Sequence, residues 1–368
     1  MKQNDINKPN ILFLAQLPPP VHGASLINKS ILESPIINEK FNFIVLPLKF
    51  VNTIEEIGKA SLIKAWMFIK IVSKLMYTLL VNKIDLVYFT ISPIGFAFYR
   101  DVLLVVLIKL FNKRIVYHLH GKGIKENSRN SKLNKILYKF VFNNTKVITL
   151  SETLNLDIDN VYNQEPFVLN NGIFDLKISK SINQKPSITF VYLSNLILSK
   201  GIMIFLEAIV LTHSKGYDFK VKIIGNSADI TISEVKEFII KNKLTEAVSV
   251  LGPKYDNDKF QELATSDVFV FPTLNDCFPL SILEAMQMHL PVISTSNGAI
   301  SDMIEHNING FIVKEGSVKD LSNAMIKYIE NTDLIIEHGL NNNIKFKSNY
   351  TQEDFEYNFI EIFNKILN

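Results

Sequence analysis

The sequence has little of what holds secreted or zinc-binding proteins together, since it contains a single cysteine, Cys277, in 368 residues. One cysteine excludes a disulfide framework and suits a reducing compartment. The seven histidines are scattered, and with the one thiol they do not give the spacing of a zinc finger or of an HExxH site. The opening segment is polar and contains no recognisable signal peptide, so we expect a cytoplasmic protein.

Long uncharged hydrophobic runs are also missing. The two longest apolar runs, 65–81 and 102–111, are interrupted by Lys70 and Lys74 and by Lys109. Neither run reaches the ~18–20 uncharged residues that a membrane span needs. We interpret both as helices. The first suits either of two positions: against the protein core with a rim of lysines, or on an anionic bilayer.

Positive charge is concentrated in the first part of the chain. Residues 1–150 contain 21 Lys/Arg and 8 Asp/Glu, a net charge of +13, whereas 151–368 contain 18 and 28, a net charge of −10. A basic half indicates an anionic partner such as a phosphate group or a membrane surface, or else a solvated lysine-rich face. The basic half contains no recognisable nucleic-acid-binding module, so we expect no nucleic-acid partner.

Short apolar runs alternate with helix-length stretches along the whole chain, which predicts parallel sheets covered on both faces. A polar stretch at 175–186 predicts a linker. The runs at 11–15 and 188–193 each lead through a glycine-bearing loop into a helix, as in a Rossmann-like unit. We therefore expect two α/β domains. The candidate strands are 11–15, 43–46, 86–90, 114–119, 147–150, 168–169, 188–193, 220–224, 248–251, 268–271, 291–294 and 310–313.

The stretch FPTLNDCFPLSILEAM, residues 271–286, has the pattern of an anion-binding helix start. A strand ends in a loop, and Pro279 fits the first position of the helix that follows. The amides of Leu280 and Ser281 are then free to bind an anion such as a nucleotide diphosphate. Glu284 lies about 6–8 Å from the helix start at ~1.5 Å per residue. There its carboxylate suits two ribose hydroxyls, although an exposed edge of an amphipathic helix is the alternative.

Asp276 lies eight residues before Glu284, and DCFPLSILEAM resembles the E-x7-E segment of glycosyltransferase family 4, whose members have the GT-B fold. Asp276 stands where the family has its first glutamate, and Pro279 stands where a glycine is frequent. The next run, LPVISTSNGAISDMIEHNINGFIV, is similar to the following motif of the family. Its glycine pair begins at Gly298, and Asp302 takes the place of a glutamate.

Three further loops carry the resemblance. PPPVHGAS keeps Gly23 of the family's N-terminal glycine-rich loop, where the backbone approaches a phosphate or a sugar closely. YHLHGKG places His120 where the family has a histidine near the transferred sugar, and His118, on the same strand face, is the alternative contact. SNLILSKG supplies Lys200 as the diphosphate partner, with Asn195 in place of an arginine.

The resemblance implies an α/β protein of the GT-B fold, with two Rossmann-like domains facing across a cleft. We expect an acceptor domain at 1–178, a nucleotide-sugar domain at 179–350, and a C-terminal helix at 351–368 that packs back on the first domain. The residues expected to act in catalysis are His120, Asp276 and Lys200. The residues expected to bind the donor are Gly23, Asn195, Lys200, Phe278, Leu280, Ser281 and Glu284.

The sequence also contains D-x-D, at Asp157 and Asp159, a motif that binds a metal in the other main glycosyltransferase fold. Here it stands in a polar, helical stretch, whereas a metal on a nucleotide needs carboxylates beside phosphates. The resemblance implies neither a metal nor another cofactor.

The function that the resemblance implies is retaining transfer of a sugar from a nucleotide-diphosphate sugar to an acceptor hydroxyl. With the basic first half, it points to a saccharide or lipid-linked saccharide acceptor in bacterial surface-polysaccharide assembly, with peripheral attachment to the inner membrane face. Two alternatives stay open at this point: a nucleotide-sugar epimerase of the same fold, and a non-catalytic nucleotide-sugar-binding scaffold.

Overall fold

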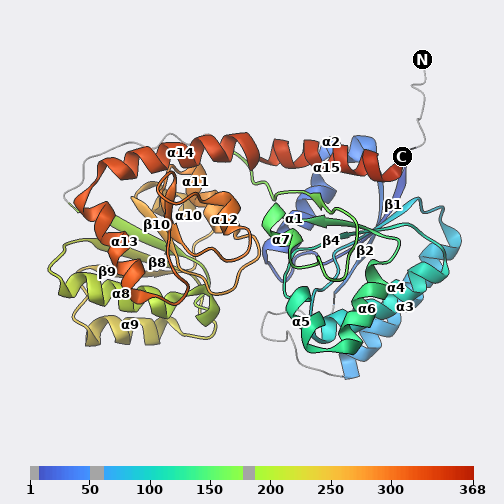
Figure 1. Ribbon diagram of the computed structural model, residues 1–368, viewed down its shortest axis with the longest axis horizontal. Helices are drawn as coiled ribbons and strands as arrows, with labels where there is room; N and C mark the ends of the chain where they lie inside the picture. The colour runs from blue at the N-terminus through green and yellow to red at the C-terminus, as the bar shows by residue number, and fades with distance from the viewer. Residues whose placement is uncertain (1–7, 50–61, 177–186) are drawn as a thin grey trace, which may run out of the picture. The chain divides into compact units, whose positions relative to one another are not determined.

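The computed structural model of the protein describes residues 8–49, 62–176 and 187–368. The chain divides into two compact units. The first unit comprises Met1–Asn171 and Glu353–Asn368, and the second comprises Gly172–Gln352. Most of the expected linker, residues 177–186, lies outside the described residues. Figure 1 shows the helices and strands of each unit, with labels on the helices and on some of the strands.

The first unit is built on a six-stranded sheet of order β2-β1-β3-β4-β5-β6, in which every neighbouring pair is parallel. Strand β1 is a continuous apolar run whose residues 11–15 are all buried, as expected for a strand covered on both faces. The elements of this unit are β1 (Asn10–Ala15), α1 (Gly23–Glu33), α2 (Pro35–Lys40), β2 (Asn42–Pro47), α3 (Leu62–Val81), β3 (Leu86–Phe89), α4 (Gly95–Leu110), β4 (Ile115–His118), α5 (Ile124–Asn130), α6 (Lys132–Phe142), β5 (Lys146–Thr149), α7 (Glu152–Asn155), β6 (Phe167–Val168) and α15 (Gln352–Leu367).

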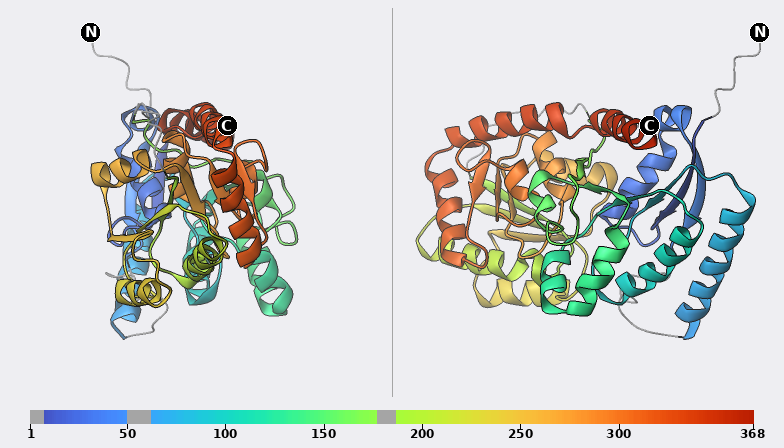
Figure 2. Two further views of the ribbon diagram at one scale, coloured as in Figure 1. Left: turned by 90° about the vertical axis from the view of Figure 1, so that its left-hand side faces the viewer. Right: turned by 45° about the vertical axis from the view of Figure 1, so that its right-hand side comes forward.

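Helices cover both faces of this first sheet (Figures 1 and 2). Helices α3, α4 and α6 bury apolar side chains, such as Leu75 and Val105, against the strand residues Val87 and Phe89 in one hydrophobic core. On the opposite face, Tyr88 contacts the aromatic rings of α15, with ring centroids 6.3 Å from Phe359. Alternation of side chains along β3 thus separates the two layers of helices.

The second unit is built on a six-stranded parallel sheet of order β12-β11-β10-β7-β8-β9. Helices α9 and α13 of this unit begin at ordinary capping residues: Thr231 forms a capping box with Glu234 at α9, and Ser317 caps α13. The elements of this unit are β7 (Thr189–Leu193), the 3₁₀ helix η2 (Leu198–Lys200), α8 (Ile202–Ser214), β8 (Lys220–Ile224), α9 (Ile232–Lys241), β9 (Val248–Gly252), α10 (Asp256–Ala264), β10 (Val268–Phe271), α11 (Leu280–Gln287), β11 (Val292–Ser294), α12 (Ile300–Met303), β12 (Gly310–Ile312), α13 (Val318–Glu330) and α14 (Asp333–Asn349).

The strand orders locate where a ligand is expected in each unit. In open parallel sheets, ligands bind outside the carboxyl ends of the strands at the point where the strand order reverses. That point lies between β1 and β3 in the first unit and between β7 and β10 in the second. All twelve predicted strands are present, and the prediction of two α/β units with parallel sheets is confirmed. Within the described residues, no helix has the length and apolar character that crossing a bilayer requires.

Candidate active site

Two loops of the second unit meet at the switch point, one after β7 and one after β10. The amide of Leu274 and the hydroxyl of Thr273 both donate to the carbonyl of Ser199, at 2.8 and 3.1 Å. Gly201 ends the first loop at φ +80°, and a Cβ there would lie 2.0 Å from the carbonyl oxygen of Pro272. Only glycine fits this close approach, which holds Lys200 against the second loop.

Lys200 and Asp276 form an ion pair where the two loops meet. The Lys200 ammonium lies 2.6 Å from Asp276 Oδ2 and donates to the carbonyl of Asn275 at 2.9 Å. Asp276 Oδ1 accepts a hydrogen bond from the Cys277 amide at 2.8 Å. Because an ammonium has three donors and a carboxylate about four acceptor sites, both groups keep capacity for a ligand.

The start of α11 follows directly on Asp276. Pro279 is the cap residue of this helix, with ψ 111°, so the prediction that it is the first helical residue is wrong by one position. An extended ψ is compatible with the fixed φ of proline, and the helix begins at Leu280. No side chain among the described residues caps this start. The amides of Leu280 and Ser281 thus begin a helix at the carboxyl edge of the sheet, as the sequence predicts.

Phe278, also predicted to bind the donor, is 6% exposed. Its ring lies against Tyr350 with centroids 6.1 Å apart. The packing of this ring fixes the loop between Asp276 and α11.

Glu284 has a partner that the sequence pattern does not reveal. Lys259 of α10 lies 2.6 Å from Glu284 Oε1, and both side chains are about four-fifths buried. Burial raises the pKa of the Glu284 carboxyl, and the Lys259 charge opposes that rise. A buried carboxylate needs such a partner to remain ionised. The Oε1–Lys259 contact leaves Oε2 able to accept hydrogen bonds from a ligand.

The loop before α12 supports Asp276 from behind. Asn297 Oδ1 accepts from the Asp276 amide at 2.9 Å, and the Ala299 amide donates to the Cys277 carbonyl at 2.8 Å. Between them Gly298 has φ +60°, and a Cβ there would lie 2.4 Å from the Asp276 carbonyl oxygen. The glycine of the predicted motif therefore lies within the same group of loops.

Asn195 is exposed on the loop after β7. Its Oδ1 accepts a hydrogen bond from the Asn226 amide at 3.4 Å. The side chain therefore contacts the loop after β8. Within the described residues, Asn195 forms no hydrogen bond with Lys200 or Asp276.

In the first unit, His118 belongs to a buried chain of hydrogen bonds. The side-chain nitrogen of Asn28 donates to the carbonyl of Gln16 at 3.0 Å, which fixes the orientation of the amide. The Asn28 Oδ1 then accepts a hydrogen bond from the Tyr88 hydroxyl at 3.1 Å. The Tyr88 oxygen is 2.8 Å from His118 Nδ1 and, having donated its hydrogen, accepts there. His118 is therefore protonated on Nδ1, and this nitrogen is occupied by the hydrogen bond to Tyr88.

His120 lies beside His118 at the carboxyl end of β4, with ring centroids 4.1 Å apart. Within the described residues, neither ring nitrogen of His120 has a hydrogen-bond partner, although both are buried. Burial lowers the pKa of His120 from 6.5 to about 3, with a further contribution from His22. A neutral imidazole with both nitrogens free suits hydrogen bonding to a ligand hydroxyl, whereas His118 has only Nε2 without a partner among the described residues.

Gly23 is exposed at the first position of α1. The preceding residue, His22, caps the helix: its Nδ1 accepts from the Ser25 amide at 3.3 Å. The loop that holds both residues follows β1, which borders the switch point of the first sheet. His22 was not predicted as a site residue, and its place between the loop prolines and Gly23 is the signal that could have found it.

The D-x-D segment has a structural role. Asp157 accepts hydrogen bonds from the amides of Gly123 and Ile124, at 2.8 and 3.0 Å, which caps α5. Asp159 pairs with Lys125 at 2.6 Å. The described residues contain no group of three or more His, Cys, Asp or Glu side chains arranged to hold a metal.

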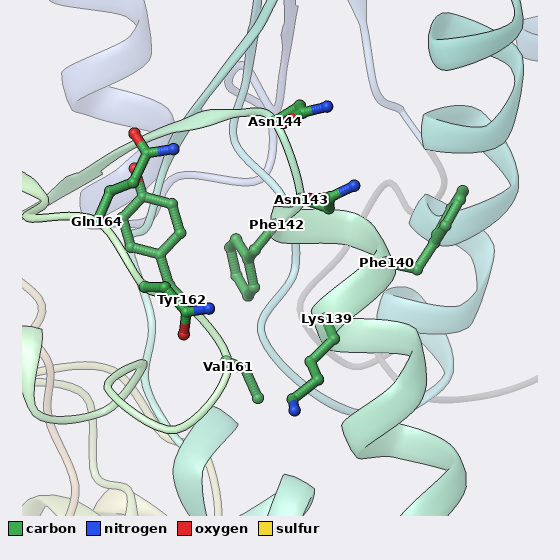
Figure 3. A pocket seen from close by; sticks show the side chains of 9 residues that line it. Lys139, Phe140, Phe142, Asn143, Asn144, Val161, Tyr162 and Gln164 are labelled. Atoms are coloured by element: carbon green, nitrogen blue, oxygen red, sulfur yellow. The ribbon is translucent and has the colours of Figure 1, made fainter.

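A cavity of about 430 Å³ lies elsewhere in the first unit (Figure 3). Its lining includes Lys139 and Phe140 from α6 and Tyr162 and Gln164 from the segment before β6. These segments precede β5 and β6, so the cavity lies at the amino edge of the sheet, opposite the His120 group. Because ligands of such sheets bind at the carboxyl edge, we do not assign the donor to this cavity.

Comparison with known proteins agrees with the motifs. Residues 187–331 match the sequence model of the family described as glycosyl transferases group 1. AmsK, an amylovoran biosynthesis glycosyltransferase of Erwinia amylovora, is 28% identical over 160 residues, which are 42% of this chain and 38% of that protein. CapM, a capsular polysaccharide biosynthesis glycosyltransferase of Staphylococcus aureus, is 25% identical over 189 residues, 51% of this chain and 48% of that protein. The chain thus spans less than two thirds of the length of these relatives.

Solved structures resemble the chain over nearly its whole length. HepE from Anabaena, in complex with UDP, has a TM-score of 0.72 at 20% identity and covers 97% of this chain and 100% of its own. Sucrose-phosphate synthase from Thermosynechococcus elongatus has a TM-score of 0.72 at 13% identity, covering 98% and 99%. These likenesses confirm the predicted GT-B fold class, and the family match confirms the resemblance to glycosyltransferases.

Proposed function

We propose that the protein is a glycosyltransferase that moves a sugar from a nucleotide-diphosphate sugar to an acceptor hydroxyl. The observation that carries this proposal is the group at the β7/β10 switch point: the Lys200–Asp276 pair, Glu284, and the uncapped start of α11. Positive charge and free amides suit a diphosphate, and the two carboxylates suit sugar and ribose hydroxyls. The matched HepE structure is a complex with UDP, which supports a uridine nucleotide as the first donor to test.

In the proposed mechanism, the bond between the sugar C1 and the diphosphate oxygen breaks while a bond from the acceptor oxygen to C1 forms on the same face. Negative charge then accumulates on the departing diphosphate. Lys200 and the amides of Leu280 and Ser281 stabilise that charge. The leaving phosphate oxygen takes the acceptor proton, and Asp276 and His120 orient the sugar through its hydroxyls. Trapping of a sugar covalently attached to an enzyme carboxylate, observed by mass spectrometry, would contradict this mechanism.

We further propose that the acceptor is a saccharide carried on a lipid at an anionic membrane surface. The net charge of +13 in residues 1–150 supports this acceptor, as do the polysaccharide-assembly roles in the names of AmsK and CapM. The first unit would then present the acceptor, and Gly23 and His22 would contact it or the transferred sugar through the loop after β1.

Isothermal titration with UDP tests the donor site. Lys200→Ala removes a charge-assisted contact of about 1.5–3 kcal/mol, so we expect UDP affinity to fall roughly 10- to 150-fold. Lys222→Ala is the matched control, because Lys222 forms a similar ion pair with Glu262 at 2.8 Å in the same unit. Equal effects of the two substitutions would contradict the assignment of Lys200.

Product analysis separates the proposed transferase from its rivals. Purified protein is incubated with a panel of UDP-sugars, with and without saccharide acceptors, and the products are identified by mass spectrometry. We expect release of UDP and a glycosylated acceptor. Isomerisation of the donor without an acceptor would establish an epimerase. Full complementation of a deletion strain by Lys200→Ala and Glu284→Ala variants would establish a scaffold.

A further inference from the structure

The helices α3, α4 and α6 form one layer on the first sheet, and the side of this layer that faces away from the sheet exposes many apolar side chains. Figure 2 (right) shows these blue-to-green helices side by side. On α3, Trp66, Tyr77 and Leu80 are exposed at helical spacing. Their neighbours Leu75 and Leu79 are buried in the core, so α3 is apolar on both of its faces. A helix of a soluble protein ordinarily presents a polar outer face.

The outer sides of α4 and α6 continue the apolar surface. On α4, Phe96, Leu103 and Leu110 are 85%, 54% and 75% exposed, at seven-residue intervals along one side of the helix. On α6, Leu133 and Ile136 are exposed one turn apart. We call the exposed side of these three helices the outer face. Exposed apolar side chains on three adjoining helices are typical of an interaction site.

The exposed charges on these three helices have one sign. The sequences of α3 and α6 contain no Asp or Glu. The single acidic residue of α4, Asp101, is fully buried and pairs with Arg100 at 2.6 Å. Lys70 lies 3.4 Å from the Trp66 ring centroid, which places a cation beside an aromatic ring on α3. Exposed lysines also flank the apolar residues of α6, at 132, 135 and 139.

We propose that the outer face binds the surface of an anionic lipid bilayer. Apolar and aromatic side chains suit the headgroup–acyl boundary, and the lysines suit anionic headgroups. A second copy of the chain fits less well, because two such faces would oppose lysines to lysines with no carboxylate between them. This inference rests on the proposed lipid-linked acceptor for its purpose, but its test uses no catalytic readout.

The sequence provides a built-in probe, since Trp66 is the single tryptophan of the chain. The full-length protein is titrated with vesicles of phosphatidylcholine alone, or of phosphatidylcholine with phosphatidylglycerol. We expect a blue shift of Trp66 emission, and quenching by brominated acyl chains, with the anionic vesicles and much less with the neutral ones. The effect should weaken as salt is added. An unchanged emission, or equal effects of both vesicles, would overturn the proposal.

Substitutions identify the surface that binds. Leu103→Ser/Leu110→Ser removes two apolar side chains from the outer face and should weaken vesicle binding about tenfold or more. Lys132→Glu/Lys135→Glu should weaken it comparably and reduce its dependence on anionic lipid. The matched control is Leu340→Ser/Ile344→Ser on α14, where both residues are exposed in the second unit.

The outcomes separate this inference from the proposed function. UDP affinity should be unchanged in the outer-face variants, because Lys200 and Glu284 belong to the second unit. Retained UDP affinity also shows that the second unit is folded. Circular dichroism checks the folding of the rest of the chain. Loss of vesicle binding in the α14 control, but not in the outer-face variants, would contradict the proposed surface. A concentration-dependent dimer in analytical ultracentrifugation that the outer-face substitutions abolish, without vesicle binding, would assign the surface to a second copy.

Discussion

At the scale of the residue, His120 combines burial with two unpartnered ring nitrogens. Its pKa is lowered to about 3 by burial, and burial also lowers the pKa of His118. A histidine that ionises at pH 6.5 when unfolded, and only near 3 when folded, binds more protons in the unfolded chain over that interval. The stability that His120 contributes is therefore complete above about pH 6.5 and is lost as the pH falls toward 3, and the contribution of His118 changes in the same direction.

We predict that His120→Asn reduces the loss of stability between pH 7 and 5, because the substitution removes one group that must stay neutral. Urea unfolding at each pH, followed by Trp66 fluorescence, measures this dependence. His213→Asn is the control, since His213 is exposed on α8. An unchanged pH dependence in the His120 variant would show that the ring is hydrated and ionises normally.

Lys259 is predicted to set the pH range of nucleotide binding through Glu284. The Lys259 charge lowers the pKa of the Glu284 carboxyl against the rise that burial causes. Lys259→Met should therefore raise that pKa, and the pH below which UDP affinity falls should move upward. Lys259→Arg should restore the wild-type profile. Titration calorimetry across pH 5–8 measures the UDP affinity of each variant. The Lys222→Met variant is the control for ionisation of UDP itself. Matching pH profiles for the Lys259→Met and Lys222→Met variants would contradict the role of Lys259.

The residues near the α11 start could be predicted from the sequence, because a short motif places them on neighbouring loops. Lys200 and Asp276 are 76 positions apart, and their pairing follows from the adjacency of β7 and β10. Lys259 could not be predicted, because its contact with Glu284 depends on how α10 packs beside α11. That both ring nitrogens of His120 lack a partner, while His118 is bonded through Nδ1, likewise depends on the Tyr88 hydroxyl reaching the His118 ring.

At the scale of the element, the loop before α12 is held so closely against the loop of Asp276 that a side chain has no space. A Cβ on Gly298 would lie 2.4 Å from the Asp276 carbonyl oxygen and 2.6 Å from that of Cys277. We predict that Gly298→Ala shifts this loop, lowers UDP affinity and lowers the melting temperature of the protein. Gly316→Ala shares the positive φ but meets no atom within 4 Å, so it should leave UDP affinity unchanged. Equal UDP affinities in the two variants would contradict the account.

The strands could be predicted because each is a short apolar run buried on both faces. Their ends lie within one residue of the prediction, and the small differences arise because a strand ends where its neighbour ends and not where hydrophobicity stops. Pro279 illustrates the same limit: its fixed φ suits both the cap and the first helical position, and only the backbone ψ separates them.

At the scale of the whole molecule, α15 belongs to the first unit although it follows the second in sequence. Phe359 is fully buried there, and its ring is stacked on Phe363 at 4.0 Å. Phe359→Ala should destabilise the first unit by about 3–5 kcal/mol. Urea unfolding followed by Trp66, which lies in the first unit, measures this loss, and UDP binding to the second unit should persist. Tyr357→Ala, at an exposed position of the same helix, is the control; equal destabilisation by both would refute the packing role.

The fold class could be predicted from the alternation of strands and helices, because parallel strands need a crossover helix between them. The outer face of α3, α4 and α6 could be predicted less completely. Apolar residues on both sides of a helix give the same composition whether the helix is buried or lies at a surface, and the sequence of α3 left both positions open. The structure shows that α3 lies at the surface, because Leu75 is buried on one side of the helix while Tyr77 is exposed.

The central claim is that the switch point of the second sheet binds the nucleotide diphosphate. A crystal structure of the protein with UDP tests it most directly. The account predicts diphosphate oxygens within hydrogen-bond distance of Lys200 Nζ and of the Leu280 and Ser281 amides, with the ribose hydroxyls on Glu284. A UDP molecule bound at any other place, or a ribose remote from Glu284, would contradict it.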